Sequence, residues 1–78
     1  MYEIYEKPDC MYCVKAKKLL KENNLEYTTI SAVVNKKHLI ERVTESTGNP
    51  PKTVPQIFFD GEYIGGYDQL CLHLSKTN

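Results

Sequence analysis

Hydrophobic and polar positions along the chain repeat with two different periods, and the changes of period divide it into predicted elements. Apolar residues two positions apart are typical of a strand, whereas apolar residues three and four positions apart indicate an amphipathic helix. On this basis the predicted strands are 2–6, 25–30, 56–59 and 63–64, and the predicted helices are 11–23, 36–47 and 67–75.

Proline and glycine mark where several of these elements end. Pro8 should end the first strand, because proline has no backbone donor and biases the preceding residue towards extended backbone. Gly48 lies where the second helix should end, since glycine readily adopts the left-handed conformation of a helix C-terminus. Asp60-Gly61 is a two-residue hairpin signal, so the last two strands are predicted to pair antiparallel.

The predicted core follows from the residues that share a face within each element. Tyr2 and Ile4 share one face of the first strand, and segment 56–59 is almost continuously apolar, as in a strand buried on both faces. The helix residues predicted to face inward are Cys13, Ala16, Leu19, Leu20, Leu39, Ile40, Val43, Leu70, Cys71 and Leu74.

The element order is therefore βαβαββα. Two strands joined through a helix are expected to run parallel, and the final pair antiparallel. The predicted fold class is α/β: one domain spanning residues 1–78, with a four-stranded mixed sheet flanked by three helices. At 78 residues the chain is expected to have a small core and modest stability.

Charge and composition exclude several partners. The formal net charge is zero and the pI is about 6.7, so no broad attraction to nucleic acid or anionic membrane is expected. No apolar run approaches the roughly 20 residues that span a bilayer. The first residues lack the basic and apolar regions of a signal peptide. We therefore expect a cytoplasmic protein, where a Cys-x-x-Cys pair more often does redox or metal chemistry than structural bridging.

Cys10 and Cys13 form such a pair at the predicted start of the first helix. Unpaired backbone N–H groups and the helix dipole would stabilise a thiolate at Cys10, so its pKa should fall below the free value of roughly 8.5. Lys7 would add to this effect and Asp9 would oppose it. The pair is interpreted as a dithiol–disulfide switch, with Cys10 the nucleophile and Cys13 the resolving thiol.

A zinc site and a structural disulfide are the two other uses that such a cysteine pair could have. A zinc site needs four ligands, and the remaining candidates (Cys71, His38 and His73) form no second motif of the usual spacing. A purely structural disulfide is typical of cysteine-dense secreted proteins, which this chain does not resemble. Cys71 is expected to be a buried core thiol with regulatory glutathionylation as the alternative, and both histidines are expected at the surface.

Two further segments are candidates for substrate binding. Thr53-Val54-Pro55 precedes the apolar strand: a cis Pro55 would expose the Val54 backbone to a peptide-like substrate, but Pro55 could equally just start the strand. Gly65-Gly66-Tyr67-Asp68 could offer backbone N–H groups to a carboxylate, with Asp68 facing an ammonium group, or could be a plain turn capped by Asp68.

Three segments of this chain resemble the signature segments of glutaredoxins. They are Lys7-Pro8-x-Cys10-x-Tyr12-Cys13, the segment Thr53 to Gly61, and the segment Ile64 to Leu70. Order and spacing agree over nearly the whole chain. Thioredoxins proper fit less well, because they have a tryptophan before the first cysteine and this chain has none.

The resemblance implies a thioredoxin fold, a cis Pro55, and glutathione as reductant with no metal. It implies that Cys10 attacks the substrate disulfide or accepts glutathione, and that Cys13 resolves mixed disulfides with protein clients, ribonucleotide reductase among them. It also implies a monomer. The residues that the resemblance places against glutathione are Lys7, Tyr12, Thr53, Val54, Pro55, Gly66, Tyr67 and Asp68.

Some points stay open within the resemblance. Met11 stands where many dithiol members have proline, and either Arg42 or Lys37 could meet the glycine carboxylate of glutathione. One alternative function is a glutaredoxin-like carrier reduced by thioredoxin reductase. Another is a glutathione-assisted [2Fe–2S] cluster carrier, against which Cys13 argues because such members typically have a single active-site cysteine. A structural adaptor is the remaining alternative.

Overall fold

The computed structural model describes residues 1–77, and this range contains the elements in the predicted order. Their bounds are β1 Tyr2–Glu6, α1 Met11–Glu22, β2 Tyr27–Ser31, α2 Lys36–Thr47, β3 Gln56–Phe59, β4 Glu62–Gly65 and α3 Tyr67–Thr77. None of the helices within this range is long and apolar enough to cross a membrane.

The strands form one mixed sheet in the order β2-β1-β3-β4. β1 pairs parallel with β2, as expected for strands joined through α1, and antiparallel with β3. β3 and β4 form the predicted hairpin around Asp60 and Gly61, both of which have positive φ. The predicted α/β fold with a four-stranded mixed sheet and three flanking helices is thus confirmed within residues 1–77.

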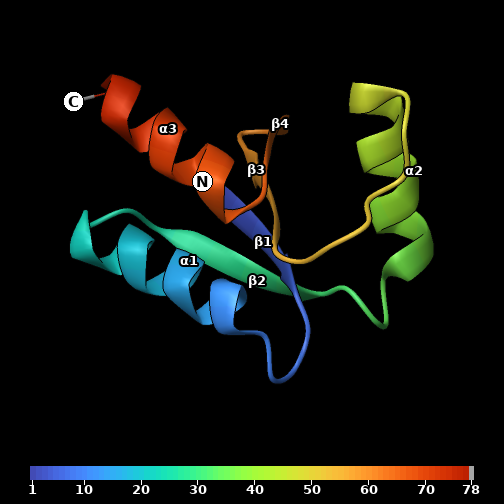
Figure 1. Ribbon diagram of the computed structural model, residues 1–78, viewed down its shortest axis with the longest axis horizontal. Coiled ribbons are helices and arrows are strands. Elements are labelled where there is room, and N and C mark those ends of the chain that lie inside the picture. Colours follow the sequence, from blue (N-terminus) through green and yellow to red (C-terminus); the bar gives the residue numbers. More distant parts are fainter. Residues whose placement is uncertain (78) are drawn as a thin grey trace.

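The two faces of the sheet bury separate clusters, because side chains alternate along each strand. On one face Tyr2, Ile4 and Ile57 pack against the apolar sides of α1 and α3. On the other face Tyr5 and Phe58 pack against α2. α1 and α3 therefore cover one face, and α2 stands apart from them (Figure 1). Apolar burial on both sides is what holds these layers together.

Several local predictions need correction. The second strand begins at Tyr27 rather than Leu25, and the last helix extends to Thr77 rather than Ser75. The fourth strand runs from Glu62 to Gly65 and so extends one residue beyond each end of the predicted segment 63–64. Leu19 and Ile40, predicted to be core residues, are only partly buried because they lie at the margins of their helix faces.

Cys71 and His73 also lie where the sequence did not place them. Cys71 was expected in the core, but its free thiol is only half buried. His73 was expected at the surface, but it is half buried, with Nε2 3.0 Å from the Tyr2 hydroxyl and its ring against Phe59. Both residues lie on flanks of α3, where burial changes sharply with a small rotation of the helix.

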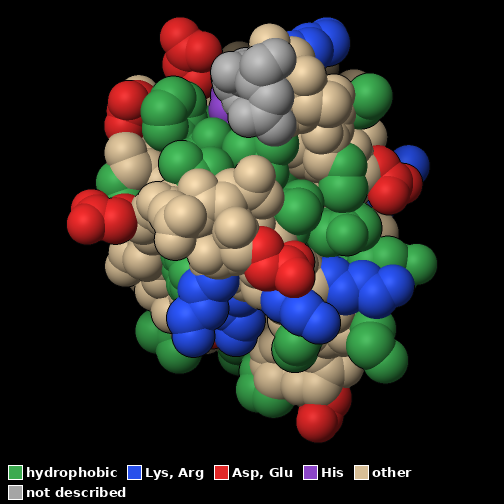
Figure 2. All heavy atoms as spheres, turned by 90° about the vertical axis from the view of Figure 1, so that its left-hand side faces the viewer, with side chains coloured by type: hydrophobic (Ala, Val, Ile, Leu, Met, Phe, Trp, Pro, Cys, Tyr) green, Lys and Arg blue, Asp and Glu red, His purple; other side chains and the backbone are tan. Residues whose placement is uncertain are grey.

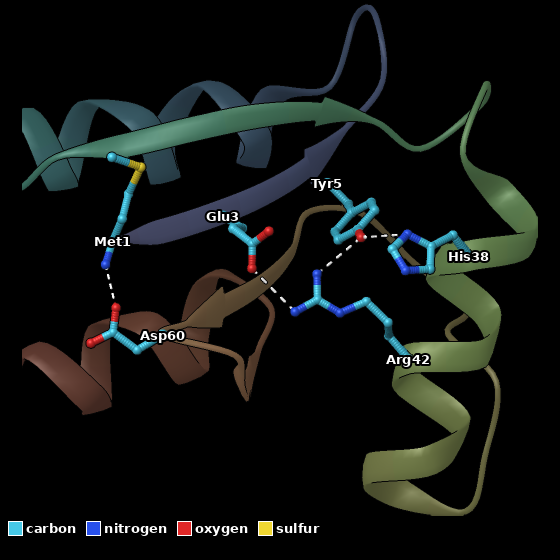
Figure 3. Close-up of polar contacts among 6 residues, drawn as sticks. All are labelled: Met1, Glu3, Tyr5, His38, Arg42 and Asp60. Carbon is cyan, nitrogen blue, oxygen red and sulfur yellow. Dashed lines mark hydrogen bonds and ion pairs between the residues drawn. The ribbon is translucent and has the colours of Figure 1, made fainter.

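Arg42 fixes α2 to the sheet (Figure 3). Its guanidinium donates to the Tyr5 hydroxyl at 3.0 Å and to the Glu3 carboxylate at 3.1 Å, and its Cζ lies 3.8 Å from the centre of the Phe58 ring. Burial alone would lower the pKa of Arg42, but the hydrogen bonds to Tyr5 and Glu3 outweigh it and raise the pKa above its ordinary value. The charged side chain of Arg42 therefore links α2 to the sheet.

Candidate redox site

Cys10 and Cys13 are joined by a disulfide at the start of α1, with their Cα atoms 5.2 Å apart. Cys10 is the N-cap of α1, and its Sγ accepts a hydrogen bond from the Cys13 backbone N–H at 3.2 Å. Asp9 has φ of 57°, a conformation that aspartate tolerates better than most residues, and this lets the chain turn from β1 into the helix. The local sequence thus places a sulfur where a helix would otherwise lack a capping group.

The two sulfurs are not equivalent. Cys10 is half exposed, whereas Cys13 is 1% exposed and packs inside the protein. An external disulfide can reach only the outer sulfur, while the inner one is within bonding distance of the outer. That an exposed Cys10 thiolate attacks and a buried Cys13 thiol resolves stays a prediction, which these two exposures allow.

The Val54–Pro55 peptide bond is cis, as the family resemblance implied. The Val54 carbonyl oxygen lies 3.7 Å from Cys10 Sγ, so this loop borders the disulfide. Gln56 holds the loop in place: its Nε2 donates to the Thr53 carbonyl at 2.8 Å, and its Oε1 accepts from the Tyr63 hydroxyl at 2.5 Å. The Val54 backbone therefore lies beside the Cys10 sulfur.

The start of α3 forms another side of the site. Rings of Tyr67 and Tyr12 lie with their centres 5.8 Å apart, which joins α3 to the first turn of α1. Gly66 lies against the loop, since a Cβ on it would be 3.6 Å from the Pro55 carbonyl oxygen. The structure therefore brings the three predicted segments, around Cys10, Val54 and Gly66, to one end of the sheet.

Gly66 itself already has a hydrogen-bond partner. Its N–H donates to Gln69 Oε1 at 2.9 Å, the arrangement in which the third residue of a helix caps its first turn. The N–H groups of Tyr67 and Asp68 open the helix and have no intrahelical acceptor, so they are the donors available to a carboxylate. Asp68 is exposed in the first turn of α3.

Lys7 and Thr53 lie at the exposed rim. Lys7 lines the same surface groove as Cys10, and Thr53 precedes Val54 on the loop held by Gln56. Lys7 makes no ion pair within residues 1–77. Both side chains are exposed, and the groove places Lys7 beside Cys10.

The two candidates for the glycine carboxylate of glutathione differ in availability. Arg42 is engaged by Glu3 and Tyr5 on the α2 face of the sheet, so its guanidinium is already occupied. Lys37 is exposed near the start of α2. No contact within residues 1–77 places either of them beside Cys10.

The zinc alternative gains no support from the described residues. No group of three His, Cys, Asp or Glu side chains within residues 1–77 is arranged to hold a metal ion. His38 Nδ1 lies 3.4 Å from the Tyr5 hydroxyl and His73 lies against Tyr2, so neither faces the cysteine pair.

Sequence reasoning missed two supporting residues. Gln56 is 4% exposed, and a buried amide in an otherwise apolar strand is a signal that it must have polar partners. Gln69 stands three residues after Gly66, which is the spacing of a helix-capping side chain. The spacing of Gln69 identifies Gly66 as its partner, whereas the sequence does not show that Gln56 bonds to Thr53 and Tyr63.

Comparisons with known proteins point to one family. The profile of the glutaredoxin family matches residues 2–64. Glutaredoxin 3 of Escherichia coli is 38% identical over 68 residues, covering 87% of this chain and 78% of that protein. Glutaredoxin 1 of Rickettsia conorii is 40% identical over 67 residues, covering 86% of this chain but 65% of the relative, just under two thirds of its length.

Solved structures agree with the sequence matches. Glutaredoxin 1 from Francisella tularensis, crystallised with cacodylate, superposes with a TM-score of 0.75 at 35% identity, covering 97% of this chain and 93% of the other. A buckwheat glutaredoxin–glutathione complex gives a TM-score of 0.77 at 27% identity, covering 97% and 69%.

Proposed function

The chain belongs to the glutaredoxin family, and on that premise we propose that it is a glutathione-dependent thiol-disulfide oxidoreductase. Its substrates are protein disulfides and glutathione mixed disulfides, and it works in the cytoplasm. The observation that carries the proposal is the position of Cys10: an accessible sulfur that caps a helix and lies 3.7 Å from a backbone carbonyl of the Val54 loop.

The reaction begins with the reduced pair. The Cys10 thiolate attacks one sulfur of a client disulfide, a Cys10–client mixed disulfide forms, and the other client sulfur leaves as a thiolate. Cys13 then loses its proton and attacks Cys10 Sγ, which forms the Cys10–Cys13 disulfide and releases the second client sulfur as a thiolate. The client gains two electrons and the enzyme pair loses two.

Glutathione returns those electrons. One glutathione thiolate attacks the Cys10 sulfur and frees Cys13, and a second attacks the resulting mixed disulfide to release glutathione disulfide and the Cys10 thiolate. The helix N-terminus assists each step in which Cys10 carries negative charge, because its dipole and the Cys13 N–H favour the thiolate.

We assign glutathione to the surface formed by the three converging segments. The Val54 backbone pairs with the cysteine part of glutathione, the N–H groups of Tyr67 and Asp68 receive the γ-glutamyl carboxylate, and the Asp68 side chain meets the ammonium group. This assignment is supported by the fold shared with the buckwheat glutaredoxin–glutathione complex. The remaining contacts in the proposal are Lys7, Tyr12, Thr53, Pro55 and Gly66.

The clients of this reaction are proteins that carry a disulfide. Ribonucleotide reductase, suggested by the family resemblance, is one candidate, and any protein disulfide that reaches Cys10 meets the chemical requirement.

A coupled assay on the mixed disulfide of glutathione with 2-mercaptoethanol tests the proposal. One arm contains glutathione, glutathione reductase and NADPH; the other contains thioredoxin reductase and NADPH without glutathione. The proposal expects NADPH oxidation in the first arm alone. Turnover in the second arm alone would keep the thiol chemistry but contradict glutathione as donor.

A further inference from the structure

A groove of about 890 Å³ borders the cysteine pair on the side of α1 and β2, away from the Val54 loop. Its lining comes from the β1–α1 connection, one side of α1 and the end of β2, and it reaches both Cys10 and Cys13. The glutathione surface proposed above shares only the rim at Lys7 and Cys10, so this groove has no assigned occupant.

The α1 side of the groove carries apolar side chains that the fold does not bury. Met11 is 69% exposed and Val14 is 57% exposed, and both line the groove together with Pro8. Clustered exposed apolar residues beside a reactive centre are typical of a binding surface. They favour an occupant with apolar side chains.

Lysines continue the same side of α1 from the edge of the groove, where Lys17 lines it, to the end of the helix. Residues three and four positions apart on a helix are neighbours, so the line through Cys10 and Val14 runs on to Lys17, Lys18 and Lys21. α1 has four lysines and one glutamate, although the whole chain has zero net charge. The lysines gather in the lower part of the face shown in Figure 2, where α1 lies.

The charges on this line are not all neutralised within the protein. Lys17 pairs with Glu6 at 2.8 Å. Lys18 and Lys21 are exposed and have no ion pair within residues 1–77. The end of the line furthest from Cys10 therefore presents uncompensated positive charge to a partner.

We propose that the groove and this lysine line hold an extended segment of the disulfide-bearing client protein, with an apolar residue near its cysteine and acidic residues further along. The inference rests on the proposed function and names the substrate class for the same site. The client sulfur must come to Cys10, so the flanking client chain lies on one of the surfaces that meet there. The groove is the surface beside Cys10 that the proposed glutathione site does not cover. The lysines favour a client segment that carries negative charge.

Two synthetic peptides test this directly. Both peptides contain the same loop closed by a disulfide, with a leucine next to one of the two cysteines. One peptide carries a tail of aspartate and glutamate, and the other carries a tail of lysine and arginine. With glutathione, glutathione reductase and NADPH present, we expect kcat/KM to be about fivefold higher for the acidic tail at low ionic strength. The difference should shrink at high salt, because screening weakens interactions between exposed charges.

Charge-reversal variants locate the preference. The double variant Lys18→Glu, Lys21→Glu should abolish or invert the preference for the acidic tail. The control is the double variant Lys36→Glu, Lys76→Glu, which reverses the charge of exposed lysines on α2 and α3 and should leave the preference unchanged. Val14→Ser should lower kcat/KM about threefold for both peptides and leave turnover of the small mixed disulfide intact. Leu72→Ser, which removes a similarly exposed apolar side chain on α3, serves as its control.

The outcomes separate the two proposals. Equal kcat/KM for the two peptides at low salt, or a preference that survives Lys18→Glu with Lys21→Glu, would overturn the groove as a client site while turnover of the small mixed disulfide upholds the proposed function. Absence of turnover on the small mixed disulfide by the unsubstituted protein would overturn the proposed function, and the client site with it.

Discussion

Cys10 Sγ lies 3.7 Å from the carbonyl oxygen of Val54, although 44 positions separate the two residues in the chain. The contact joins the start of α1 to the loop before β3. In the proposed function, a glutathione mixed disulfide at Cys10 would therefore also meet the Val54 backbone, and the two could pair there.

The first prediction concerns the pKa of Cys10 in the reduced protein. The Cys13 N–H and the helix dipole both favour the Cys10 thiolate, so its pKa should lie below the free value of about 8.5. The rate of alkylation by iodoacetamide against pH measures it, using Cys71→Ser to remove the half-buried third thiol. A midpoint at or above the free-thiol value would refute the stabilisation by the helix.

Cys13→Ser should separate two activities. Reduction of glutathione mixed disulfides needs only Cys10, whereas release of a protein client from its mixed disulfide needs the resolving thiol. We expect the variant to keep most of its turnover on the small mixed disulfide and to lose most reduction of a protein disulfide. Cys71→Ser is the matched control and should retain both. Equal loss of both activities in Cys13→Ser would contradict the assigned roles.

Arg42→Met should destabilise the fold without weakening glutathione binding. It removes the hydrogen bonds from Arg42 to Tyr5 and Glu3, leaving the Tyr5 hydroxyl only its contact with His38, at a cost of about 1–3 kcal/mol in the free energy of unfolding. Urea denaturation and the KM for glutathione are the two measurements, with the exposed Lys36→Met as control. Unchanged stability combined with a raised KM would instead make Arg42 a ligand of glutathione.

Tyr63→Phe tests the support behind the Val54 loop. Removing the hydroxyl deprives the buried Gln56 amide of its 2.5 Å partner, and we expect a loss of about 1–2 kcal/mol in the free energy of unfolding. The loop should also become less well held, so kcat/KM should fall modestly. Thermal unfolding and the coupled assay measure the two effects, and a variant as stable as the parent would show that Gln56 finds another partner.

The same tyrosine makes stability depend on pH. Burial raises the pKa of Tyr63 above its ordinary value of 10.0. As pH rises above about 10, the unfolded tyrosine ionises before the folded one, so the unfolded state binds fewer protons and the free energy of unfolding falls. Below that pH the contribution is fully present. Denaturation between pH 8 and 11 should show a shallower fall for Tyr63→Phe than for the parent; parallel curves would contradict the shift.

The periodic segments were predictable because local physics decides them. Pro8, Gly48 and Asp60-Gly61 each impose a backbone conformation wherever they occur, and the spacing of Ala16 and Leu20 requires a buried helix face. The cysteine pair was predictable for the same reason, since its chemistry depends on its place at the start of α1.

Long-range pairing was not predictable in this way. Arg42 lies 37 and 39 positions from Tyr5 and Glu3, and nothing near it in the sequence tells an inward arginine from a solvated one. Cys71 was wrongly predicted to be buried, because residue spacing alone does not define the edges of the buried face of a helix. The groove beside Cys10 also depends on how α1 packs beside β2. The sequence of either element alone does not specify this packing.

The most direct test of the proposed mechanism is the mass of a Cys13→Ser, Cys71→Ser variant after incubation with glutathione disulfide. The Cys10 thiolate should attack one glutathione sulfur, expel the other as a thiolate, and remain as a stable mixed disulfide, because no resolving thiol is left. We predict one glutathione per chain, mapped to Cys10 and released by a reducing agent. A chain that stays unmodified under these conditions would contradict glutathione as the partner of Cys10.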